Sequence, residues 1–165
     1  MSSPESADLI AGLPRKRIGA GVLFVDETDR VLLVEPTYKP YWEIPGGVVE
    51  ARESPHAAAA REVREELGLT VIPGDLLVVD WIPPGLYPDD GVMFVYDGGI
   101  LTSDRTDAIV LQAEELRGWS WCDEAEAAER LPDVLVRRVA AARDARTVGV
   151  PTYLEDGVRI SVNGR

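Results

Sequence analysis

The order of apolar and polar positions along the chain predicts short strands and helices that alternate irregularly. Two apolar runs, at 18–25 and 30–35, flank the polar stretch DETD and predict a β-hairpin. Other strand patterns lie at 69–82, where PGD interrupts the run, and at 91–101, 108–112 and 119–121. Helical patterns lie at 54–67, 123–130 and 132–146, and a terminal hairpin is predicted around EDG within 153–162. This order favours an α+β fold or an α/β sandwich over a doubly wound parallel sheet.

The chain is long enough for one hydrophobic core. It has 165 residues, of which 45% are hydrophobic and 28% charged, as in ordinary globular proteins. Residues 1–14 are small and polar and are expected to form a flexible arm, which leaves 15–165 as a single domain. No apolar run approaches the roughly 18 residues of a membrane-spanning helix, so no membrane association is expected.

The net charge limits the classes of partner that the protein is expected to bind. Lys and Arg number 17 against 29 Asp and Glu, which gives a net charge of −12. Because no basic stripe follows Arg15-Lys16-Arg17, nucleic acid and anionic membranes are not expected as partners. A protein this acidic would need a metal ion to handle phosphates. The single cysteine, Cys122, excludes an intrachain disulfide, and the sequence starts without a signal-peptide pattern, so a cytoplasmic location is expected.

Carboxylates are concentrated around the helix predicted at 54–67. Its start and end are marked by Ser54 as N-cap, a proline in the first turn and Gly68 as the C-terminal glycine. On that helix Glu62, Glu65 and Glu66 fall within an arc of about 100°. Small residues one turn earlier, Ala58 and Ala59, share this arc, while an adjacent apolar stripe is formed by Ala60, Val63 and Leu67. The arc is either a solvated acidic face or a site for hard divalent cations, which prefer oxygen ligands.

The spacing of these residues resembles a known family motif. Gly47, Glu53 and the run REVREELGL at 61–69 fill every fixed position of the Nudix box, and WEIPG at 42–46 is similar to the usual approach to that box. The resemblance implies an α/β/α sandwich with a mixed sheet, here with a C-terminal helix and hairpin. It also implies an enzyme that hydrolyses the diphosphate linkage of a nucleoside diphosphate derivative or nucleoside triphosphate with Mg²⁺ or Mn²⁺.

The same resemblance assigns roles to residues of the box. It implies that the metal ligands are the carbonyl of Gly46 and the side chains of Glu62, Glu65 and Glu66. Glu53 and Arg61, together with Gly47, are similar to the residues that brace the box. Metal ions held in this way would neutralise a diphosphate and activate water. The catalytic candidates are therefore Glu62 and Glu66.

The sequence leaves two positions open for the general base, one in the box and one in a later loop. Glu62 can take a proton while it holds a metal ion, but many relatives use a loop glutamate. Glu114 and Glu115 lie shortly before Trp121, at the place where such a residue is expected, and Glu115 is preferred. The alternative is a solvated pair of loop carboxylates.

The substrate is only broadly constrained by the sequence. Arg17 and Lys39 are candidates for phosphate contacts, and Tyr41 and Trp81 for stacking on a base; the alternatives are surface charge and ordinary packing. Pro84 lies where ADP-ribose-hydrolysing relatives tend to carry proline, which ranks ADP-ribose-like compounds slightly above deoxynucleoside triphosphates. A small nucleotide is expected as partner, and a homodimer is left open.

Two other functions compete with hydrolysis. A catalytically silent nucleotide-sensing domain would not need the full set of metal ligands that this chain has. A diphosphate isomerase on the same fold would need a reactive active-site cysteine, and Cys122, on the short strand after the loop, is a poor candidate.

Overall fold

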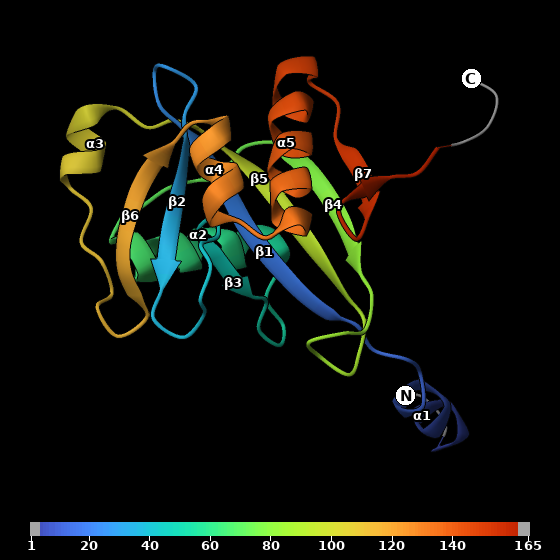
Figure 1. Ribbon diagram of the computed structural model, residues 1–165. Coiled ribbons are helices and arrows are strands. Elements are labelled where there is room, and N and C mark those ends of the chain that lie inside the picture. Colours follow the sequence, from blue (N-terminus) through green and yellow to red (C-terminus); the bar gives the residue numbers. More distant parts are fainter. Residues whose placement is uncertain (1–3, 162–165) are drawn as a thin grey trace.

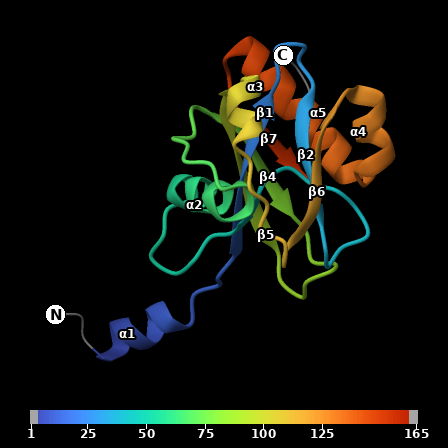
Figure 2. The same ribbon diagram turned by 90° about the vertical axis from the view of Figure 1, so that its left-hand side faces the viewer.

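The central strand, β1 (Arg17–Val25), separates two hydrophobic cores. A computed structural model describes residues 4–161 of the chain. On β1, Ala20, Val22 and Phe24 pack with α2 (Pro55–Leu67), whereas Leu23 and Val25 belong to the core beneath α5 (Asp133–Val148). Successive side chains of a strand point to opposite faces, so α2 and α5 cover opposite faces of the sheet (Figure 2). The predicted α/β/α sandwich is confirmed.

The sheet has eight strands and is mixed. Its order is β6 (Leu116–Cys122), β2 (Val31–Pro36), β1, β5 (Gly91–Ile100), β4 (Leu76–Ile82), β7 (Thr152–Glu155) and β8 (Val158–Arg159). β1 pairs with β5, and β4 with β7, in parallel, and the other pairs are antiparallel. A short strand, β3 (Gly46–Val48), pairs with the first half of β1. Figure 1 shows α5 and the shorter α4 (Glu124–Arg130) over one face of the sheet.

β1 changes its partner along its length. It pairs with β2 only at the hairpin end, where Val25 faces Val31, and with β3 from Gly19 to Gly21. The hairpin turn is held by Asp26, whose Oδ1 accepts hydrogen bonds from the N–H groups of Thr28 and Arg30 at 2.9 Å. The predicted hairpin is confirmed. The next strand after β2, β3, places the start of the box beside β1.

The predicted strand at 108–112 is wrong. The chain first forms α3 (Ser103–Asp107) and then runs past the C-terminal end of α2 without joining the sheet. There the N–H of Val110 donates to the carbonyl of Leu67, and that of Gln112 to the carbonyl of Glu66, at 2.9 and 3.1 Å. The last carbonyls of a helix have no partner within it, so this segment satisfies them and its apolar pattern reflects packing on α2.

The ends of the chain carry further elements. Within the segment expected as an arm, α1 (Pro4–Ala11) forms a helix that projects from the sheet (Figure 1), with Leu9 and Ile10 exposed. Residues 1–3 lie outside the described residues. The C-terminal hairpin is present as β7 and β8, while position 162 of its predicted range is also outside them. Within residues 4–161, none of the helices has the length and apolar character needed to span a bilayer.

Candidate active site

The three box glutamates of α2 differ in their exposure. Ser54 caps the helix by accepting a hydrogen bond from the N–H of Ala57, and Gly68 ends it with a φ of 69°, as the sequence predicts. Glu66 is 2% exposed, whereas the side chains of Glu62 and Glu65 are 12% and 45% exposed. The three carboxylates thus run from the protein interior to solvent along one helix.

The small residues of α2 have a different role from the one expected. Ala58 and Ala59 are fully buried and pack in the same core as Val63 and Leu67. Ala60, which was assigned to the apolar stripe, is only half-buried. The buried face of α2 is therefore rotated towards the glutamates, and this rotation is what buries Glu66.

Two glycines bring the backbone of β3 against these carboxylates. The N–H of Gly46 donates to Glu66 Oε2 at 3.0 Å, and Gly46 has a φ of 156°, which side chains disfavour. A Cβ on Gly47 would collide with the carboxylate of Glu62. Gly47 is needed at this position because the Glu62 carboxylate occupies the space that a side chain would fill.

Arg61 and Glu53 form the brace that the family resemblance implies. Arg61 Nε and Nη2 donate to the two oxygens of Glu53, each at 2.9 Å, and Nη2 also donates to the carbonyl of Val48 at 3.0 Å. The hydrogen bonds from Arg61 lower the pKa of Glu53 to about 2. The same guanidinium reaches the metal-ligand candidates, because Nη1 lies 2.9 Å from Glu62 Oε1 and 3.0 Å from Glu65 Oε2.

Glu115 is held at the site by its backbone. Its carbonyl accepts from the N–H of Thr37 at 2.7 Å, and its N–H donates to the carbonyl of Gln112 at 2.9 Å. Since the Gln112 N–H in turn binds the Glu66 carbonyl, the loop is fastened to the box helix. Of the two loop glutamates, Glu115 lines the cavity described below and Glu114 does not.

A cavity of about 600 Å³ adjoins the glutamates. Its volume lies within the range of small-molecule sites, roughly 300–1,000 Å³. The carboxylates in its lining come from Glu43, Glu50, Glu62, Glu65, Glu66 and Glu115. The cationic side chains in its lining come from Arg17, Lys39, Arg61 and Arg138.

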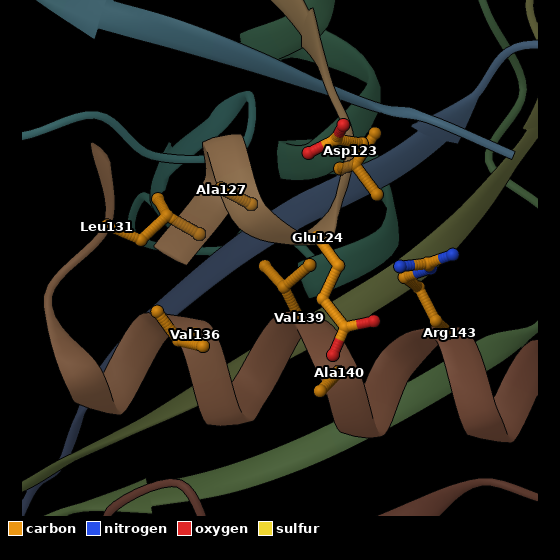
Figure 3. A pocket seen from close by; sticks show the side chains of 9 residues that line it. Asp123, Glu124, Ala127, Leu131, Val136, Val139, Ala140 and Arg143 are labelled. Carbon is orange, nitrogen blue, oxygen red and sulfur yellow. The ribbon is translucent and has the colours of Figure 1, made fainter. Parts of the chain in front are cut away.

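A second hollow, between α4 and α5, is too small for a nucleotide. Its volume is about 40 Å³, and apolar side chains form much of its lining, with Asp123, Glu124 and Arg143 as its charged members (Figure 3). A space of that size holds on the order of one water molecule. It is a packing gap between two helices on the α5 face.

The candidates for substrate contacts divide into two groups. Arg17 and Lys39 line the cavity. Arg17 lies over the ring of Tyr87 at 3.9 Å, and Lys39 Nζ is paired with Glu43 at 2.7 Å. Tyr41 and Trp81 are not among the cavity-lining residues, and the Trp81 indole N–H instead donates to Asp90 at 2.8 Å.

Sequence reasoning missed several residues that line the cavity, among them Tyr38, Met93 and Arg138. Arg138 carries a detectable signal, because it lies four residues after Val134 and four before Ala142, on the face of α5 that packs on the sheet. Tyr38 and Met93 carry no such signal, since a loop tyrosine and a strand methionine are common in ordinary packing.

The acidic group fits a hard divalent cation in its chemistry. Burial raises the pKa of Glu66 to about 9, and the charges of Glu62 and Glu115 act in the same direction. Burial also raises the pKa of Glu62. A bound cation would reverse these shifts, and all donors here are oxygens. Within residues 4–161, no three acidic, His or Cys side chains are already gathered into a ligand group for a metal ion, and Arg61 contacts oxygens of both Glu62 and Glu65.

Comparison with known proteins agrees with the motif and the fold. The family model of the NUDIX domain matches residues 15–143. A MutT-like protein of Streptomyces ambofaciens is 27% identical over 146 residues, which cover 87% of this chain and 86% of that protein. An ADP-ribose pyrophosphatase of Mycobacterium tuberculosis is 37% identical over 103 residues, 61% of this chain and about half (48%) of that protein.

Solved structures show the same architecture. The MutT protein from Methanosarcina mazei Go1 superposes with a TM-score of 0.66 and 26% identity, covering 82% of this chain and 99% of that one. The family match includes the box, the glutamates that contact Arg61 and the cavity-lining residues as far as α5. The chain therefore belongs to the Nudix family and is a hydrolase of that family.

Proposed function

We propose that this enzyme hydrolyses a diphosphate bond in a small nucleoside diphosphate derivative or nucleoside triphosphate, with Mg²⁺ or Mn²⁺ as cofactor. Nudix hydrolases generally need divalent metal ions. The observation that carries the proposal is the buried Glu66 beside Glu62, at the wall of a cavity that also holds Arg17 and Lys39. Such a site combines oxygen ligands for metal with cations for phosphate.

The proposed ligands are the side chains of Glu62, Glu65 and Glu66 and the carbonyl of Gly46. Divalent cations bound there would neutralise the diphosphate and lower the pKa of the attacking water. Glu115, fastened to the end of α2, is positioned to take the proton of that water, with Glu62 as the alternative base.

The chain's own residues account for the remaining steps. The water oxygen forms a bond to phosphorus while the bond from phosphorus to the bridging oxygen breaks, and the leaving phosphate keeps the bridging oxygen. Arg17 and Lys39 hold non-reacting phosphate oxygens, and the brace between Arg61 and Glu53 keeps β3 and α2 in register.

The relatives suggest which substrates to try. The Mycobacterium tuberculosis protein is named an ADP-ribose pyrophosphatase, and a Bacillus subtilis protein that is 44% identical over 50 residues is named a putative 8-oxo-dGTP diphosphatase. A panel of ADP-ribose, nucleotide sugars, dinucleotide polyphosphates and nucleoside triphosphates is therefore assayed with Mg²⁺, with Mn²⁺ and with EDTA, and the products are separated by chromatography.

We expect turnover of at least one panel member with metal and none with EDTA. Full turnover in the chelated sample would contradict the metal role. If nothing is cleaved but one nucleotide raises the melting temperature, the sensing function replaces hydrolysis.

A further inference from the structure

The cavity has a second part whose chemistry differs from that of the glutamates. It reaches the α5 side of the sheet, where its lining is apolar and comes from Ile44, Met93, Leu131, Leu135 and Val139. We call this part the apolar lobe. One charged side chain, Arg138, lines the cavity from the same stretch of α5.

Arg138 is held rigidly. Its Nε donates to Asp80 Oδ2 at 2.7 Å, and the other oxygen of Asp80 accepts from the N–H of Gly157 at 3.0 Å. Asp80 is fully buried and Arg138 is 7% exposed. The guanidinium is therefore fixed by α5, β4 and the turn between β7 and β8 together, so its remaining donors have set directions.

The pair is neutral overall, which decides the kind of group that it can recognise. Within residues 4–161, the Arg138 guanidinium donates its hydrogen bond to Asp80 through Nε. Its Nη1 and Nη2 groups therefore remain available as donors. Because Asp80 already balances the charge, a phosphate gains little here compared with Arg17, for which no ion pair is found among the described residues. An uncharged ring with adjacent acceptors fits both the neutral pair and the apolar lining.

We infer that Arg138 selects the base of the substrate and favours a purine with a keto oxygen at C6 and an acceptor at N7, as in guanine, over adenine. This inference rests on the proposed function. An arginine fork donates to O6 and N7 of guanine as a bidentate pair, whereas adenine places an amino donor beside N7. Arg138 is thus a specificity residue, and Asp80 and Gly157 position it.

The first test compares substrates that differ only in the base. GTP, ITP, 7-deaza-GTP and ATP, and the pair GDP-glucose and ADP-glucose, are assayed for kcat/KM. We expect the guanine member to exceed the adenine member by roughly 10- to 100-fold. ITP, which keeps O6 and N7, should follow GTP, and 7-deaza-GTP, which lacks the N7 acceptor, should lose most of the advantage. Equal values for GTP and ATP would overturn the inference.

The second test changes the fork while keeping the charge. Arg138→Lys leaves a cation opposite Asp80 but removes the planar pair of donors, so the preference for guanine should fall while the adenine values stay in their range. Arg146→Lys is the matched control, because Arg146 is on the same helix, pairs through Nε with Asp97 at 3.1 Å and does not line the cavity. An equal loss on both bases in Arg138→Lys would mean a structural role only.

A binding measurement separates this inference from the proposed function. The affinities of GMP and AMP for the metal-free protein are measured by calorimetry, with and without Arg138→Lys. Selective binding of GMP without any turnover would leave the inference standing and refute hydrolysis, whereas equal binding of the two would refute the inference. If Arg138→Lys fails to fold, the double variant Asp80→Asn, Arg138→Gln removes both buried charges, and it too should bind GMP and AMP equally.

Discussion

The backbone N–H of Gly46 and the carboxylate of Glu66 are joined by a hydrogen bond of 3.0 Å across 20 residues of chain. This bond ties the start of β3 to the last turn of α2, so Gly46 and the Glu66 side chain are held together at the wall of the cavity. It also gives a buried carboxyl one fixed donor, which reduces the cost of its burial. The position of Glu66 is thereby set before any ligand arrives.

Replacing Glu66 by glutamine should abolish most of the activity and preserve the fold. The amide keeps an oxygen for the Gly46 N–H but cannot supply a negative charge to a cation, so kcat should fall by about 100-fold or more. The melting temperature of the metal-free variant should equal or exceed that of the parent, because burial disfavours the ionised carboxyl. Steady-state kinetics and thermal melts measure the two effects.

Glu27→Gln serves as the control for this variant, since Glu27 is exposed in the turn between β1 and β2. It should run at the parent rate. A Glu66→Gln enzyme with parent kcat would remove Glu66 from the set of metal ligands.

Glu115→Gln should lower kcat more than Glu114→Gln does. Glu115 lines the cavity and is fastened to the box helix through Gln112, while Glu114 is exposed outside it. Loss of a general base typically costs about 10²- to 10⁴-fold in rate. The two kcat values, measured at saturating metal, decide the assignment, and parent rates in both variants would leave Glu62 as the base.

Gly47→Ala should damage the site without unfolding the protein. The added Cβ would meet the carboxylate of Glu62, which must then leave its place. We expect kcat to fall by roughly 10-fold or more, because small displacements of catalytic groups have large effects on rate. Gly118→Ala is the control, since its Cβ would lie 3.7 Å from the nearest side-chain atom, Glu35 Oε2. A Gly47→Ala enzyme as active as this control would contradict the crowding.

The ion pair between Arg61 and Glu53 should make the stability of the fold depend on pH. Arg61 lowers the pKa of Glu53 from an ordinary 4.5 to about 2, so its stabilising effect is complete above pH 4.5 and is lost as pH falls towards 2. Glu53→Gln should therefore melt below the parent at neutral pH, and the difference should narrow between pH 4.5 and pH 3. A difference that stays constant from pH 7 to pH 3 would show that the ion pair does not stabilise the fold.

The box and its surroundings are largely readable from the sequence. Local signals decide them: Ser54, Pro55 and Gly68 set the ends of α2, and the spacing of the glutamates sets one face. The strand expected at 108–112 failed because an apolar segment that packs on a helix end has the same short pattern as a strand. The burial of Glu66 was also missed, since helical spacing gives the angular order of side chains but not the rotation of the helix against its sheet.

The far side of the cavity was beyond sequence reasoning for a different reason. Met93 and Arg138 belong to β5 and α5, which are distant from the box along the chain and meet it only through the tertiary fold. The ion pair of Arg138 with Asp80 joins positions 58 residues apart, and no local rule connects them.

The backbone contacts of the segment after α3 have a consequence for how this chain tolerates changes in length. The N–H groups of Val110 and Gln112 donate to carbonyls at the end of α2, and the Gln112 carbonyl accepts from the N–H of Glu115. These hydrogen bonds fix the length of the segment that connects Glu66 to Glu115 in space. One residue inserted between Gln112 and Glu115 would shift the glutamate away from the cavity. Insertions within α3, whose residues are largely exposed, would leave these hydrogen bonds in place. The chain should therefore tolerate changes in length before Val110 but not between Val110 and Glu115.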